Sequence, residues 1–384
     1  MVRARRLGDA RSMFRTPLHQ GLPRTASAAA HLRLFVLVGV VTVLVTRAFL
    51  ALTGYPKLGG GAANGGLHIS HMLWGGLLML AGLLVMLVRA GAASRRRGAV
   101  LGGVGFGLFI DEVGKLVATD GYFYRPAPGI IYLSFVMLTG FAQWVARRAH
   151  KDRREAPGAL RAADAAETAL HGVLGGLTAQ ERCEALRRLC GTEGPPTALD
   201  TALAALIEAV PERPAPPPAP HHEALARARV RASELMAQLT RTRGLVHLVA
   251  WGTTLQAVVL LVAVTAEGVT GGLDGETPWP AVTGALVCSL ATLALSLRGT
   301  ARLLSDRDAA LRTLRAALLV DLVVGQVFKF TINQFSGVSD WLISVALLCL
   351  LCRCSAGPTD RQVPSPQAVE SAATTLRATT RQAV

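Results

Sequence analysis

Eight long apolar runs constrain the fold of this chain more than any other feature. A bilayer core about 30 Å thick needs about 20 helical residues to cross it. Four apolar runs precede a long polar stretch and four follow it. The runs cover residues 34–54, 67–88, 99–118, 129–146, 245–266, 280–297, 316–332 and 338–352. The sequence therefore predicts an all-α, polytopic membrane protein with eight transmembrane helices.

The composition agrees with a membrane protein and argues against a water-soluble enzyme. Hydrophobic residues make up 51 % of the 384 residues and charged residues only 17 %, and the mean hydropathy is +0.40. Soluble domains carry about 25 % charged residues, which lie mostly on their water-exposed surfaces. The net charge of +15 fits either a nucleic-acid partner or the basic cytoplasmic loops of a membrane protein, so its distribution has to decide.

The basic residues fall on alternate connections between the runs. Clusters of Arg and Lys occupy residues 1–33, 89–97, 147–154 and 298–315, whereas the opposite connections hold only Lys57 and Arg125. Positive residues mark the cytoplasmic side of a membrane protein. The pattern predicts cytoplasmic termini, a bacterial plasma (inner) membrane location with the lipid bilayer as partner, and no nucleic-acid partner.

The chain divides into two four-span membrane units with a polar insert between them. The predicted parts are a basic cytoplasmic arm (1–33), a first unit (34–146), a cytoplasmic helical insert with a Pro-rich linker (147–244), a second unit (245–352) and a disordered cytoplasmic tail (353–384). Asp111 in the third run matches Asp321 in the seventh, 210 residues later. Such spacing favours tandem halves with one orientation, although two unrelated four-span units also match loosely.

Polar and charged side chains gather at the outer ends of the first three runs. They come within roughly 10 Å of the outer surface, counting 1.5 Å per helical residue, and can meet. His68 and His71 are three residues apart and therefore share one helix face. Asp111 and Lys115 are four residues apart, a spacing that favours an ion pair within the helix. Arg47 in the first run would pair with whichever carboxylate of the third run faces it. The residues are Arg47, His68, His71, Asp111, Glu112 and Lys115.

Three interpretations of this cluster stay open. Ion pairs can hold helices in register, and titratable side chains within a membrane can bind or relay a proton, a small solute or an anionic headgroup. Alternatively, His68 and His71 with Asp111 or Glu112 could ligate Zn or Fe. The second half keeps Asp321 and adds Gln326, Lys329 and Gln334, but Pro278 and Ala281 stand where the histidines would be. A single site is therefore expected in the first half.

Two motifs carry a resemblance to known sequences. Residues 68–76 read HISHMLWGG, fitting HxxHMLWGG, and residues 105–115 read GFGLFIDEVGK. Over roughly its first 150 residues, the chain resembles a family of uncharacterised, multi-pass integral membrane proteins of GC-rich, actinobacterial-like bacteria. The resemblance implies a membrane fold and no particular activity.

We expect a non-enzymatic membrane protein whose outer-leaflet site binds or relays a small ligand or proton. One alternative is a metal-dependent, membrane-embedded hydrolase or oxidoreductase. Another is a scaffold or signalling protein that binds a cytoplasmic protein partner through residues 147–244. A homo-oligomer is compatible with each of these roles.

Overall fold

The computed structural model describes most of the membrane units and part of the insert. The described residues are 27–53, 71–89, 91–116, 126–155, 157–189, 197–214, 228, 231, 243–269, 279–333 and 337–355. They are almost entirely helical, and the only β pairing among them is an isolated bridge between Leu177 and Glu212. The all-helical prediction is confirmed over these residues.

The first four predicted runs lie on four long helices. These are α2 (Ala28–Leu52), α3 (His71–Val88), α4 (Ala92–Leu116) and α5 (Ala127–Glu155). Helix α4 begins seven residues before the predicted run, and α5 continues nine residues beyond it. Arg, Ala and Lys in these extensions are good helix formers, so the helix continues where the apolar character ends.

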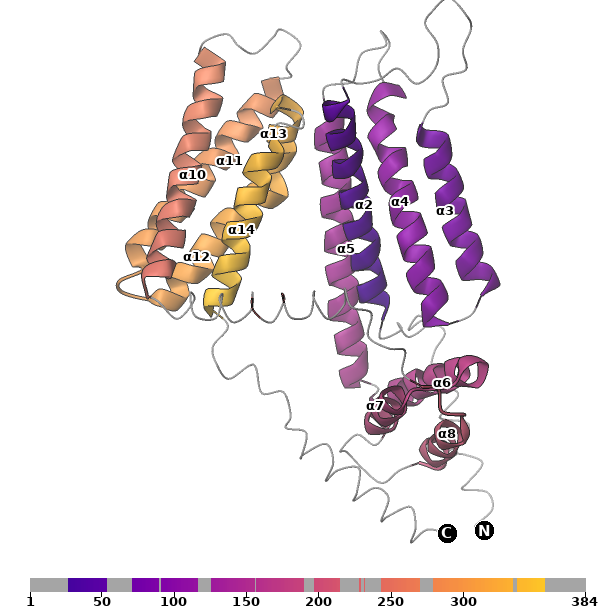
Figure 1. Ribbon diagram of the computed structural model, residues 1–384. Coiled ribbons are helices and arrows are strands. Elements are labelled where there is room, and N and C mark those ends of the chain that lie inside the picture. Colours follow the sequence, from indigo (N-terminus) through magenta and orange to yellow (C-terminus); the bar gives the residue numbers. More distant parts are fainter. Residues whose placement is uncertain are drawn as a thin grey trace, which may run out of the picture. The chain divides into compact units, whose positions relative to one another are not determined.

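The second group of runs also lies on helices, and one of them is interrupted. The elements are α10 (Arg243–Val269), α11 (Trp279–Arg302), α12 (Arg307–Val320), a π-helical turn η2 (Asp321–Gly325), α13 (Gln326–Asn333) and α14 (Val338–Ser355). Figure 1 shows α10, α11, α12 and α14 side by side. Helix α12 begins before the predicted run 316–332, because Asp306 caps its start by accepting a hydrogen bond from the Ala309 N–H.

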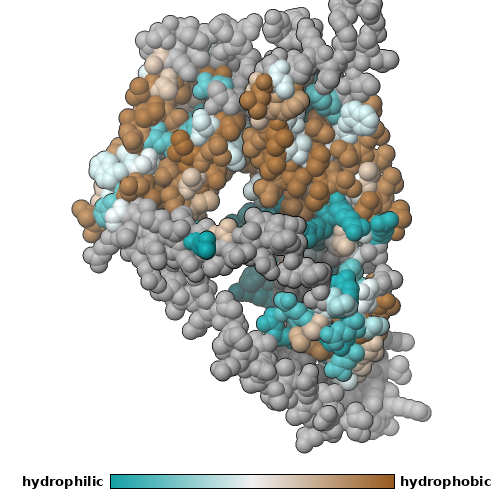
Figure 2. All heavy atoms as spheres, in the orientation of Figure 1, coloured by the Kyte–Doolittle hydropathy of each residue, from teal (hydrophilic) through white to brown (hydrophobic). Residues whose placement is uncertain are grey.

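Six described helical segments are long and apolar enough to cross a membrane. They are Ala28–Leu52, His71–Val88, Ala127–Asp152, Val246–Ala266, Trp279–Arg302 and Arg307–Asn333. Helix α4 is not among them because charged side chains occupy both its ends, and α14 is not among them either. Many apolar side chains face outward: Leu37 is 61 % exposed and Leu255 is 64 % exposed. Figure 2 shows this hydrophobic surface, which fits helices that face lipid.

Glycines bring the first membrane helices into backbone contact. A Cβ on Gly75 would lie 2.7 Å from the Gly105 carbonyl oxygen, and a Cβ on Gly107 would lie equally close to that of Gly39. Small residues allow this approach between membrane helices. Helices α2, α3 and α4 are therefore held close beside the predicted polar cluster.

The contacts within the chain divide it into two compact units. One comprises Met1–Phe35, Leu83–Val100 and Thr139–Ala215, and the other comprises Val36–Gly82, Leu101–Leu138 and Pro216–Val384. Each of α2 to α5 contributes residues to both units.

The unit that contains the insert has its own apolar core. Its helices α6 (Pro157–Gly175), α7 (Ala179–Leu189) and α8 (Ala198–Ala209) pack together around fully buried side chains such as Ile207. In this unit, Arg95 at the start of α4 forms an ion pair with Glu167 of α6. Of the predicted insert 147–244, residues 215–242 lie almost wholly outside the described residues.

Candidate functional site

The first charged contact joins α2 to α4. Arg47 Nε lies 2.6 Å from Asp111 Oδ1, and a second guanidinium nitrogen donates to the Asp111 carbonyl oxygen at 3.2 Å. The Asp111 side chain is only 3 % exposed. Because one positive and one negative charge meet, this pair is neutral overall. The structure thus brings together the arginine and a carboxylate that the sequence placed at the same depth.

A second contact joins α3 to α4. His71 Nδ1 lies 3.1 Å from Glu112 Oε2, and the Glu112 carboxylate is 5 % exposed. Consecutive residues point about 100° apart on a helix, so Asp111 and Glu112 reach different neighbours. The carboxylates of α4 therefore bind two separate helices.

The remaining members of the predicted cluster are only partly described. His68 and Gln334 lie outside the described residues, and Lys115 is described only as a position in α4. Across the described part of the chain, no three His, Cys, Asp or Glu side chains are grouped closely enough to hold a metal ion. The Zn or Fe site thus stays a hypothesis that depends on His68.

The second half contains a larger network, built on one ammonium and two carboxylates. Lys329 Nζ lies 2.5 Å from Asp321 Oδ1 and 3.0 Å from Asp340 Oδ2. The side chains of Lys329 and Asp321 are 4 % and 3 % exposed. With all three groups ionised, the network carries one net negative charge. A single ammonium is thus shared by two carboxylates inside a membrane helix bundle.

Neutral side chains complete this network. Ser344 donates to Asp321 at 2.8 Å, and the Gln326 amide nitrogen donates to Asp340 at 2.6 Å and to Asp321 at 3.3 Å. Gln256 of α10 donates to the other Asp340 carboxylate oxygen at 2.7 Å. The Gln326 side chain is fully buried, and its Oε1 has no hydrogen-bond partner among the described residues. The network therefore has a spare acceptor in its interior.

The π-helical turn begins at Asp321. In α4, Gly114 follows Asp111 by three residues, whereas Gly325 follows Asp321 by four. A π turn closes hydrogen bonds one residue later than an α turn and often marks a functional site. The Tyr132 hydroxyl donates to the Leu322 carbonyl oxygen in this turn at 2.5 Å.

The interruption also helps Asp321 and Lys329 to meet. Eight residues of straight α-helix separate two side chains by about 12 Å along the axis and about 80° around it. A π segment departs from this geometry and can kink a helix. The direct Asp321–Lys329 contact is therefore a property of the interrupted helix, which apolar periodicity does not reveal.

Sequence reasoning missed three members of the network. Asp340 and Ser344 lie in the apolar run 338–352 and Gln256 lies in the run 245–266, and none of them is among the predicted site residues. Two features of the sequence could have pointed to them: Asp340 and Ser344 are four residues apart, and the amide of Gln256 lies in the middle of the fifth apolar run. The structure also places the denser network in the second half, whereas the sequence favoured the first.

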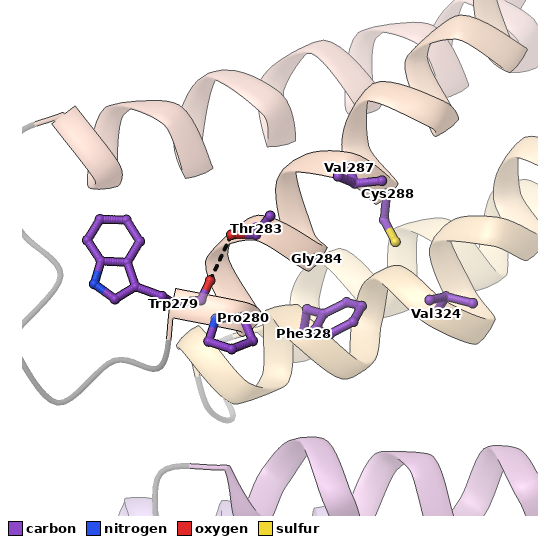
Figure 3. A pocket seen from close by; sticks show the side chains of 8 residues that line it. All are labelled: Trp279, Pro280, Thr283, Gly284, Val287, Cys288, Val324 and Phe328. Atoms are coloured by element: carbon purple, nitrogen blue, oxygen red, sulfur yellow. Dashed lines mark hydrogen bonds between the residues drawn. The ribbon is translucent and has the colours of Figure 1, made fainter.

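A separate apolar groove lies on α11, η2 and α13. It encloses about 650 Å³ and is lined by Trp279, Pro280, Thr283, Gly284, Val287, Cys288, Val324 and Phe328. Figure 3 shows the Cys288 sulfur pointing from α11 toward the helix that carries Val324 and Phe328. No carboxylate or ammonium lines the groove, so the charged network is a distinct feature.

Comparisons with known proteins do not assign this site. No protein-family model, no curated protein and no solved structure matches the chain.

Proposed function

We propose that this multi-pass membrane protein binds and relays protons at the network of Asp321, Lys329 and Asp340. The observation that carries the proposal is the sharing of one buried ammonium by two carboxylates. Ionisable groups within a membrane are costly and commonly mark proton or ion pathways.

The charge balance supports a proton as the ligand. An excess negative charge in a low-dielectric interior is unfavourable, and two neighbouring carboxylates disfavour each other's ionisation. Uptake of one proton makes the network neutral.

The surroundings of Asp321 are compatible with this role. Among the described residues, the titratable groups that face it are Lys329, Asp340, Cys288 and Tyr132. Of these, only Lys329 is cationic. No second described cation therefore neutralises the excess negative charge.

The same proposal includes eight membrane crossings, with both termini in the cytoplasm of a bacterium. Helix α14 has 18 residues, which span about 27 Å as an α-helix. On α4, Asp111 and Glu112 are both partnered by neighbouring helices. Internal partners lower the cost of placing this charged helix in the bilayer.

The test is infrared difference spectroscopy of the purified full-length protein during a pH titration. A protonated carboxyl group has a C=O stretching band that a carboxylate lacks. We expect such a band in the wild type on acidification and its loss or shift in Asp321→Asn. Asp308→Asn is the matched control, because Asp308 is an exposed residue in the first turn of α12. An identical band in wild type and Asp321→Asn would overturn the proposal.

A further inference from the structure

Helix α11 carries a row of hydroxyl side chains through the second membrane unit. Thr292, Ser296 and Thr300 are spaced by four residues, so they share one helix face at intervals of about 6 Å. Thr292 is 4 % exposed and Ser296 is fully buried. The row is therefore inside the protein and does not face lipid.

One end of this row reaches the level of Asp321. Helices α11 and α12 are antiparallel, with Gly299 opposite Leu314, and α11 continues along η2, where a Cβ on Gly325 would lie 3.4 Å from the Cys288 Cβ. Thr292 lies four residues after Cys288, and Asp321 lies four residues before Gly325. Since the chains run in opposite directions, Thr292 and Asp321 lie at about the same level.

The hydroxyls at this end have spare hydrogen-bonding capacity. Thr292 Oγ1 and the neighbouring Ser289 Oγ have no hydrogen-bond partner among the described residues, although Ser289 is only 3 % exposed. In contrast, the Ser296 hydroxyl farther along the row donates to the Leu293 carbonyl oxygen at 2.9 Å, and the Thr254 hydroxyl of α10 donates to the Ala250 carbonyl oxygen at 3.1 Å. Burying a hydroxyl without a partner is unfavourable, so simple helix packing does not account for Ser289 and Thr292.

The other end of the row leads toward the basic end of α11. The Thr300 hydroxyl donates to the Ser296 carbonyl oxygen at 2.9 Å and lies 3.1 Å from the Thr254 hydroxyl of α10. Arg302 follows in the last turn. The positive residues assign this end to the cytoplasmic side.

We propose that the hydroxyls of Ser289, Thr292, Ser296, Thr300 and Thr254 line the route by which protons from the cytoplasmic side reach Asp321. The inference rests on the proposed function and adds the route that the protons follow and the side of the membrane from which they come. At each step, an oxygen of a hydroxyl or of an intervening water molecule accepts one proton and releases another. Only O–H bonds form and break, and the transfer ends with one proton on the network.

The test measures how fast the carboxyl band appears after a rapid drop in pH. The variant is Ser289→Ala/Thr292→Val, which removes both hydroxyls and nearly preserves side-chain volume. The control is Thr283→Val on the same helix, since Thr283 is exposed and lies outside the buried row of hydroxyls. Because both hydroxyls nearest to Asp321 are removed, the transfer should slow by about tenfold or more.

The result separates the route from the proposed function. A slower band of unchanged final amplitude in the double variant, with wild-type rates in Thr283→Val, supports the route. Wild-type rates in the double variant would overturn the route while leaving proton binding intact. Absence of an Asp321-dependent band in the wild type would overturn the proposed function and the route together.

Discussion

Asp111 in the first half of the chain and Asp321 in the second half are bound in different ways. Asp111 pairs one-to-one with Arg47, and the adjacent Glu112 pairs with His71. Asp321 instead shares Lys329 with Asp340, at the start of a π-helical turn. A neutral pair can simply join two helices, whereas an unbalanced network retains capacity for another positive charge. The comparison teaches that the partners, and not the aspartate itself, determine what a membrane-buried acid can do.

The largest effect is expected from Lys329→Met. Removing the shared ammonium leaves the buried Asp321 carboxylate and the partly buried Asp340 carboxylate without a counter-charge, which should destabilise the protein by about 3–5 kcal/mol. Acid should reduce this loss, because protonation neutralises the carboxylates. Thermal unfolding in detergent at neutral and acid pH measures both effects.

Arg312→Met serves as the control for Lys329→Met, because Arg312 is exposed on α12. Equal losses in the two variants would show that Lys329 is not a special charge in the fold.

An intermediate effect is expected from Arg47→Met. This substitution leaves the buried Asp111 carboxylate without its counter-charge and should lower the free energy of unfolding by about 3 kcal/mol. The double variant Arg47→Met/Asp111→Leu should recover most of that loss, because well-packed apolar residues often replace a buried ion pair without penalty. Unfolding measurements on both variants give the comparison. A double variant that stays as unstable as the single one would mean that this pair is not a simple helix-joining contact.

The smallest effect is expected outside both networks, at Glu181 in α7. Hydrogen bonds from the Thr178 backbone N–H and hydroxyl, with Arg213 and His171 nearby, lower the pKa of Glu181. The pKa of Glu181 is therefore lower in the folded protein than in the unfolded chain. The ionised carboxylate stabilises the fold fully above the unfolded-state pKa, and this stabilisation is lost as the pH falls through the folded-state pKa. Glu181→Gln should therefore weaken the insert by a few tenths of a kcal/mol at neutral pH.

Hydrogen exchange of α7 peptides in the full-length protein measures this difference. It should disappear in acid, where the wild-type carboxylate is also neutral. A difference that persists in acid would assign the effect of Glu181→Gln to packing.

Much of the architecture followed from the sequence, but the site did so only in part. The apolar runs located the membrane helices, and the depth of Arg47 and Asp111 anticipated their pairing. The helix ends were less accurate, because α4 and α12 begin in polar residues that favour helix. Asp340 was placed outside the site, since its position in the sequence shows that it lies near a helix start but not which helices surround it.

The apolar runs are enough to identify a helical, membrane-type protein with ionisable residues inside its apolar segments. Hydrophobicity and charge are properties of consecutive residues, so they are visible before folding. The tertiary structure alone decided that Asp321, Lys329 and Asp340 form one network and that Gln256 and Ser344 complete it. Those contacts depend on how three helical segments pack and on a π turn that changes which side chains face one another, and neither is encoded in local periodicity.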